Sequence, residues 1–359
     1  MKIIYRYVLS NFLRYLFFTL LVLIFIYIII NLFDNLGRYL SRNIPFNDIL
    51  IYYLYLIPSY AVLLVPVATI IGIFFIFGYM TKYREIIALK SQGMDINNLF
   101  LLIIITGIFI SVSTFIFQET VVVWAQARLT RHRAEKIDKR PLPSATVRHN
   151  FFYYGEKNWI YYIKEFNPKD STLKNVMLWK VDQQRHITKR IDAHSAKFIN
   201  FWQFKDVTVR EFDSLDNEHI NYYPVLDLPE LKETPNDFSR IPKPMEEMNF
   251  IELSGFVRRR LRAGEDVAKE RVELNYRFSF PFITLILILI CLPISVVLRR
   301  GGVAIGLGIS IVLAFIYWGF IQSCRAYGYA GIMHPVLSAW LPNIIFGIFG
   351  LISFFGIRR

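Results

Sequence analysis

The sequence lacks the signatures of several enzyme classes. It contains no Gly-Lys pair, which the phosphate-binding Gly-x-x-x-x-Gly-Lys-Ser/Thr motif of an ATPase requires. It also lacks His-Glu-x-x-His, Gly-x-Ser-x-Gly and Cys-x-x-Cys, the usual motifs of zinc proteases, serine hydrolases and thiol redox proteins. Only two cysteines occur, Cys291 and Cys324, and both lie in apolar sequence. We therefore expect a protein that is not an enzyme and has no catalytic residues, cofactor or metal site.

Charged residues are also missing from six long stretches. The chain has 41 Lys and Arg against 28 Asp and Glu, yet these stretches contain none: Tyr15–Phe33, Ile49–Thr81, Ile96–Gln118, Phe278–Leu298, Gly301–Cys324 and Ala326–Ile357. A hydrocarbon core about 30 Å thick needs about 20 apolar residues per helix, which each stretch reaches or nearly reaches. The sequence therefore predicts an α-helical membrane protein with six transmembrane helices. The basic residues that give the net charge of +13 then mostly flank the membrane spans. No nucleic-acid partner is therefore expected.

The short loops predict how the chain is oriented. Three basic residues, Arg38, Arg42 and Arg325, fall on one side of the membrane. Ten fall on the other: Lys2, Arg6, Arg14, Lys82, Arg84, Lys90, Arg299, Arg300, Arg358 and Arg359. Because Lys and Arg are enriched in cytoplasmic loops, both termini are expected in the cytoplasm. Acidic residues are absent from the six stretches, which argues against the ion relay of a secondary transporter.

The segment between the third and fourth spans has a different composition. Residues 119–273 are rich in charged and aromatic residues, and their apolar runs are too short to cross a membrane. β-Branched and aromatic residues predict strands at Asn150–Tyr154, Trp159–Phe166, Asn175–Val181, His186–Ile191, Ser195–Phe201 and Asp206–Phe212. Residues 1–118 and 274–359 then hold three spans each, around an inserted periplasmic β-sandwich or β-jellyroll with flanking helical linkers. Prolines from Pro224 to Pro244 predict an extended exit, followed by a helix over Phe250–Tyr276 that breaks at Gly264.

The cytoplasmic loop after the second span carries the most specific motif. It runs from Lys82 to Asp95 and contains a short apolar segment, with Glu85 near its start and Gly93 at its end. Such a helix can dock into a groove of a soluble partner. It can equally lie on anionic lipid through Lys82, Arg84 and Lys90. Amphipathicity alone does not separate these two interpretations.

The segment Tyr83–Gly93 resembles the coupling-helix motif of the LptF/LptG permeases, the YjgP/YjgQ family that exports lipopolysaccharide. The resemblance covers nearly the whole chain: Asp34 after the first span, the three-plus-three arrangement of spans, the inserted β domain, Leu274–Phe278 and Pro281. The segment Trp159–Phe212 is more similar to LptG than to LptF.

The resemblance implies a permease subunit of an ABC transporter in the inner membrane. Its partners would be a paralogous subunit (LptF or LptG), a cytoplasmic ATPase dimer (LptB) and the periplasmic jellyroll proteins LptC and LptA. Glu85, with Arg84 and Gly93, would couple the ATPase to the spans. The alternative from another class is a six-span scaffold that presents a periplasmic interaction domain for envelope assembly.

Lipopolysaccharide carries phosphates above its acyl chains, so its site needs arginines at the rim of an apolar cavity. The candidates are Arg38 after the first span and Arg128, Arg131 and Arg133 after the third. Arg38 and Arg133 fall where LptG-like proteins carry substrate-contacting basic residues. Two further basic positions of the family are occupied by Asn31 and Gly37. The alternative is that these arginines only flank the membrane.

Overall fold

The computed structural model describes residues 2–139, 147–155, 158–182, 186–212, 218–239, 243–262, 265–297 and 302–356. The chain divides into a helical unit (Met1–His132, Met245–Leu253 and Ala268–Arg359) and a β unit (Arg133–Pro244 and Ser254–Val267). Four arginines of the charge count, Arg299, Arg300, Arg358 and Arg359, lie outside the described residues, as does Gly264.

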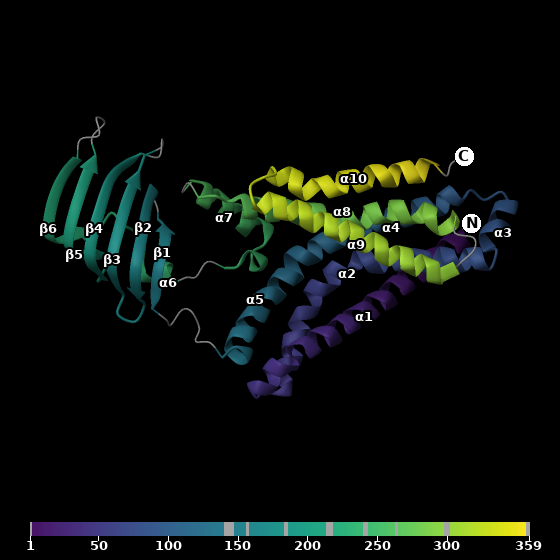
Figure 1. Cartoon of the computed structure of the whole chain (residues 1–359), viewed down its shortest axis with the longest axis horizontal. Helices are drawn as coiled ribbons and strands as arrows, with labels where there is room; N and C mark the ends of the chain where they lie inside the picture. The colour runs from purple at the N-terminus through teal and green to yellow at the C-terminus, as the bar shows by residue number, and fades with distance from the viewer. Residues whose placement is uncertain are drawn as a thin grey trace. The chain divides into compact units, whose positions relative to one another are not determined.

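The helical unit confirms the six membrane spans. The candidate spans are formed by α1 (Lys2–Ser41), α2 (Phe46–Lys82), α4 (Ile96–Phe117), α8 (Ala268–Val297), α9 (Gly302–Tyr329) and α10 (Pro335–Gly356). A π-helical turn at Gln118–Val122 joins α4 to α5 (Val123–His132), so that the third span continues well beyond its apolar part. The short helix α3 (Glu85–Ser91) lies between α2 and α4 (Figure 1).

Two of the spans, α2 and α8, form the centre of the helical unit. In their most apolar windows 67% and 72% of the residues are buried, whereas only 6% are buried in α1. Close approach of helices contributes to this packing, because a side chain at Gly306 of α9 would collide with Phe74 of α2. Most of the apolar surface of α1 is therefore left uncovered by this chain and faces lipid or another protein.

The helices extend beyond the charge-free stretches and carry charged residues into the bundle. Glu119 continues the third span, and α8 begins at Ala268, before the predicted start at Phe278. The apolar stretches contain no acidic residue, but the helices that include these stretches do. Opposite charges that pair with each other allow a helix to continue past the apolar boundary.

The β unit confirms an inserted β domain. Six antiparallel strands form one sheet in chain order, so every strand pairs with its neighbours in sequence (Figure 1). The strands are β1 (Arg148–Tyr154), β2 (Trp159–Asn167), β3 (Thr172–Val181), β4 (Ile187–Phe198), β5 (Trp202–Phe212) and β6 (Glu218–Leu228). Within the described residues this is a single meander, without the two packed sheets of a sandwich or the crossed connections of a jellyroll.

Two local predictions need correction, and a third is confirmed. The stretches His186–Ile191 and Ser195–Phe201 belong largely to one strand, β4, which pairs with β3 and β5 on both sides of Asp192. The exit predicted around Pro224 is strand β6. After the 3₁₀ turn Met245–Glu247, helix α7 (Phe250–Arg262) ends before α8 begins, so the predicted helix is interrupted near Gly264 as expected.

One face of the sheet is covered by the segment that follows β6. The short helix α6 (Pro235–Ser239) inserts Phe238 among Tyr153, Tyr161 and Trp202, at ring distances of 4.9 to 5.5 Å. The Tyr161 hydroxyl donates a 2.7 Å hydrogen bond to the buried Glu233 carboxylate. Burial, followed by this hydrogen bond, raises the pKa of Tyr161. A buried polar contact thus fixes the return segment on the apolar face.

Candidate functional site

The residues expected to couple an ATPase lie at the two ends of α3. Arg84 is the residue before the helix and has a left-handed backbone (φ 59°), so the chain turns sharply between α2 and α3. Glu85 occupies the first turn, where a carboxylate is favoured by the helix dipole.

The predicted end of α3 at Gly93 has the geometry of a Schellman motif. Gly93 has a φ of 79°, its N–H donates to the Lys90 carbonyl, and the Met94 N–H donates to the Leu89 carbonyl. After it, the Asp95 carboxylate accepts a 2.9 Å hydrogen bond from the Asn97 N–H and caps α4. Both junctions of α3 are therefore closely specified.

The two faces of α3 differ in exposure. Ile86 is 5% exposed and belongs to the core of the helical unit, and Leu89 packs against that core. Ile87 is 62% exposed and Tyr83, just before the helix, is 63% exposed. Lys82 lies 5.6 Å from the centre of the Tyr83 ring. We call the exposed side chains of Tyr83 and Ile87 the α3 surface.

The first turn of α3 also meets the start of the chain. The Tyr7 side chain of α1 lies near the Glu85 carboxylate. Figure 1 shows the amino-terminus and α3 at the same end of the helical unit. The chain continues directly from α2 into α3 and from α3 into α4, and α3 packs against both of these helices.

Three of the predicted substrate arginines lie toward the carboxyl-terminal ends of α1 and α5, at the end of the helical unit away from α3 (Figure 1). Arg38 lies in the last turn of α1, while Arg128 and Arg131 lie three residues apart on α5, and all three are exposed. His132 Nε2 is 2.9 Å from the carbonyl oxygen of Asp48, which fastens the end of α5 to the start of α2 next to the α1–α2 turn. The Arg128 guanidinium lies 5.1 Å from the Trp124 ring. We call Arg38, Arg128 and Arg131 the arginine rim.

The fourth predicted arginine, Arg133, belongs to the β unit, where its Nε lies 3.6 Å from Asp138 Oδ2. Its side chain is half exposed. Asn31, which takes the place of a basic residue of the family, accepts a 3.2 Å hydrogen bond from the Tyr53 hydroxyl. This position therefore has a polar partner inside the helical unit and contributes no charge.

Sequence reasoning missed two partly buried ion pairs in the helical unit. Arg277 pairs with Glu119 at 3.1 Å, and Arg325 pairs with Glu273 while its guanidinium lies 4.1 Å from the Tyr276 ring. Glu119 and Arg277 stand directly beside the ends of charge-free stretches. Opposite charges at two such ends were the available signal, but pairing them requires knowledge of which helices are neighbours.

The comparison with known families settles the identity of this architecture. The family model described as lipopolysaccharide export system permease LptF/LptG matches residues 6–355. The chain belongs to the LptF/LptG family. As a member it is a permease subunit of the lipopolysaccharide export system, a multi-pass protein of the inner membrane and not an enzyme.

Curated relatives of the LptF/LptG family agree with this assignment. The chain is 21% identical to the proteins named lipopolysaccharide export system permease protein LptF from Escherichia coli K12, E. coli O157:H7 and Shigella flexneri. Each match covers 96% of this chain and 92% of the relative. These relatives bear the LptF name and not the LptG name that the sequence analysis favoured, and an identity of 21% shows the family without choosing between its two members.

Proposed function

We propose that this permease subunit is driven by a separate cytoplasmic ATPase, LptB, which docks on the α3 surface. The chain has no phosphate-binding motif of its own. The exposed Ile87 and Tyr83 offer an apolar contact, while the buried Ile86 anchors the same helix in the core. Short apolar anchors on a helix are the usual means by which a helix binds in a groove. The single observation that carries the proposal is this division of α3 into a buried and an exposed side.

Coupling follows from the way α3 is connected. Because the Arg84 turn and the Gly93 motif leave no flexible linker, a displacement of α3 moves the ends of α2 and α4. Glu85 supplies a carboxylate at the edge of the α3 surface, where a basic group of the ATPase can pair with it. The termini and α3 would then lie in the cytoplasm and the β unit in the periplasm.

A paralogous subunit, LptF or LptG, would cover the apolar face of α1. In the most apolar window of α1, only 6% of the residues are buried by this chain, far less than in any other span. Side chains such as Phe17, Phe25 and Phe33 are 63 to 69% exposed. Lipid can cover such a face, but pairing of two subunits through it encloses a cavity for substrate between them.

The β unit would pass substrate toward the periplasmic jellyroll proteins LptC and LptA. Its edge strand β6 is exposed along most of its length, including Ile220, Tyr222 and Val225. An open edge offers unpaired backbone groups to another sheet. A continuous sheet with a neighbouring jellyroll would extend the apolar face of this domain.

The arginine rim would bind lipopolysaccharide phosphates. Arg128 and Arg131 present two guanidinium groups on one side of α5, and guanidinium groups pair with phosphate through two parallel hydrogen bonds. We propose the same role for Arg133. Replacing Arg128 and Arg131 by Gln should lower photocrosslinking to lipopolysaccharide, whereas Lys136→Gln should not. Unchanged crosslinking would leave these arginines as membrane-flanking residues only.

The test of the main proposal is copurification followed by an ATPase assay. A tagged chain extracted in mild detergent should bring down an ATP-binding cassette subunit, and its absence would favour the scaffold alternative. In the reconstituted complex, Glu85→Gln should lower substrate-stimulated ATP hydrolysis by about tenfold, the value of one charge-assisted hydrogen bond. The complex should still assemble. Full stimulation in this variant would remove Glu85 from the coupling path.

A further inference from the structure

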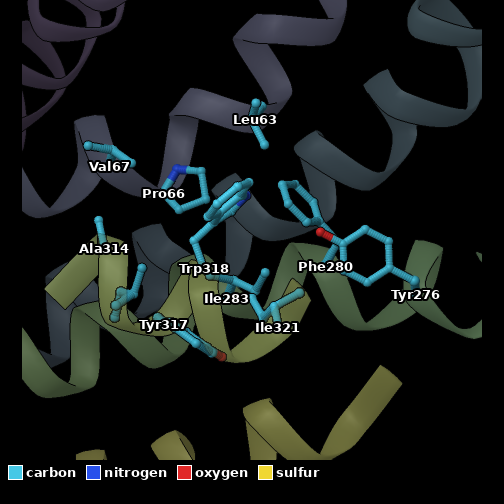
Figure 2. A pocket seen from close by; sticks show the side chains of 11 residues that line it. Leu63, Pro66, Val67, Tyr276, Phe280, Ile283, Ala314, Tyr317, Trp318 and Ile321 are labelled. Atoms are coloured by element: carbon cyan, nitrogen blue, oxygen red, sulfur yellow. The ribbon is translucent and has the colours of Figure 1, made fainter. Parts of the chain in front are cut away.

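Two adjoining cavities lie inside the helical unit, and neither suits a lipid chain. The polar cavity has a volume of about 250 Å³ and is lined by the ion-paired Arg277 and Arg325, which an acyl chain would not solvate. The apolar cavity, around which Figure 2 shows Leu63, Phe280 and Trp318, has a volume of about 40 Å³. It has room for only a few water molecules. Contacts with phospholipid are therefore expected on the outer surfaces of the helices.

Helix α7, which returns the chain from the β unit, begins at the end of the membrane spans. The Phe250 N–H donates a 2.6 Å hydrogen bond to the Glu119 carboxylate, and the Phe250 ring meets the Phe278 ring edge-on at 4.7 Å. Glu119 directly follows one charge-free stretch, and Phe278 begins another. The first turn of α7 therefore lies where the apolar parts of the third and fourth spans end, at the level of the lipid head groups.

The only acidic residue in the sequence of α7 is engaged at the start of the helix. The Glu252 carboxylate accepts a 3.3 Å hydrogen bond from the Asn249 N–H, and the Glu252 N–H donates at 2.8 Å to the Asn249 side chain. This reciprocal arrangement is a capping box, which fixes the first turn. The charged residues that follow Glu252 in α7 are all arginines.

Apolar and basic side chains share the exposed face of α7. Leu253 and Val257 are buried on one side of the helix. Ile251 is 78% exposed, and Arg258 and Arg259, seven and eight residues later, are exposed as well. Residues with this spacing lie on the same side of an α-helix. The exposed face of α7 therefore places one apolar side chain next to the membrane boundary and two guanidinium groups beyond it.

The charges of Arg258 and Arg259 are not compensated within the described part of the chain. Arg260 pairs with Glu265, whereas neither exposed arginine makes an ion pair with a residue that the structure describes. At 1.5 Å per residue, the two arginines lie about 10 to 12 Å along the helix from Ile251. Anionic lipid attracts basic side chains over about this distance, and long arginine side chains extend toward the head groups.

We propose that the exposed face of α7 binds an anionic phospholipid at the membrane surface. Arg258 and Arg259 pair with the head-group phosphate, which a guanidinium group contacts through two parallel hydrogen bonds. Ile251 contacts the upper part of the acyl chains. A choline phospholipid carries the same phosphate, but its ammonium group cancels the net charge that attracts the arginines. The inference rests neither on the proposed ATPase contact nor on the arginine rim.

A photoreactive leucine analogue at position 251 tests the proposal. The full chain with this residue is placed in nanodiscs that contain equal amounts of a glycerol and a choline phospholipid with the same acyl chains. After irradiation, the mass of each adduct identifies the captured lipid. The glycerol lipid should be captured about tenfold more often than the choline lipid, because two basic side chains attract it.

Charge-matched variants separate recognition by α7 from the net charge of the protein. Replacing Arg258 and Arg259 together by Gln should bring the two adducts to equal yield. Replacing Lys164 and Lys197 by Gln removes the same charge from exposed positions of the sheet and should leave the preference unchanged.

Four results would overturn the proposal. The first is equal capture of the two lipids by the chain with both arginines, and the second is an unchanged preference without them. The third is a loss of preference in the lysine variant as well, which would assign the preference to net charge. The fourth is capture of lipopolysaccharide or protein in place of phospholipid when lipopolysaccharide is added to the nanodiscs, which would assign this face of α7 to another partner.

Discussion

The Nη1 atom of Arg277 lies 3.1 Å from the Oε1 atom of Glu119, and the two side chains are only 9% and 13% exposed. The same guanidinium donates to the Met245 carbonyl at 2.7 Å, and the same carboxylate accepts from the Phe250 N–H at 2.6 Å. This ion pair thus joins the third and fourth spans to the segment that returns from the β unit. A buried pair with all these hydrogen bonds fixes one arrangement of the three segments.

Removing one partner of this pair should cost more than removing both. Arg277→Leu leaves Glu119 buried without its counter-charge and should destabilise the helical unit by about 3 to 5 kcal/mol. The double variant with Glu119→Leu should be less destabilised than the sum of the single variants. Thermal unfolding of the four proteins in one detergent gives the double-mutant cycle. Additive losses would show that the two side chains do not interact.

The Tyr161–Glu233 hydrogen bond should stabilise the β unit locally. Tyr161→Phe removes the donor to a buried carboxylate and should lower the opening free energy of β2 by about 1 to 3 kcal/mol. Tyr162→Phe is the matched control, because the Tyr162 hydroxyl donates at 3.2 Å to Asn150 at an exposed site. Hydrogen exchange of the β2 amides in the full chain measures both. Equal protection in the two variants would contradict a stabilising role for the contact.

Gly93 should be required for its backbone conformation. A side chain there would meet no atoms within 4 Å, but the left-handed φ of 79° costs an alanine about 1 kcal/mol. Gly93→Ala should therefore speed hydrogen exchange in α3 about fivefold. Gly308→Ala, at an uncrowded helical glycine, should change nothing in α3. Unaltered exchange after Gly93→Ala would mean that the Schellman motif does not hold the end of α3.

The sequence was sufficient for features that depend on local composition. Six charge-free stretches identified the spans, and glycine at position 93 marked the end of α3, because both follow from the residues themselves. The lengths of the helices could not be predicted from local composition. Glu119 extends its helix only because Arg277, far away in the chain, neutralises it. The polar cavity depends on such pairings and was missed for the same reason.

The strands show a similar limit. Pro224 suggested an extended exit, since proline disrupts a central strand. It is tolerated in β6 because that strand lies at the edge of the sheet, and the pairing skips it between Lys205↔Val225 and Val207↔Tyr223. The skipped partner, Asp206, has a positive φ of 54°. Whether a strand is an edge strand is decided by the sheet and cannot be known from the strand alone.

The central claim, that α3 is the docking site of a separate ATPase, is tested most directly by photocrosslinking at adjacent positions. A photoreactive amino acid is placed at Ile87, which is 62% exposed, or at Ile86, which is 5% exposed, and the membranes are irradiated. The account predicts a crosslink from position 87 to the ATP-binding subunit and none from position 86. A crosslink from position 87 to lipid alone, in membranes that contain the ATPase, would contradict it.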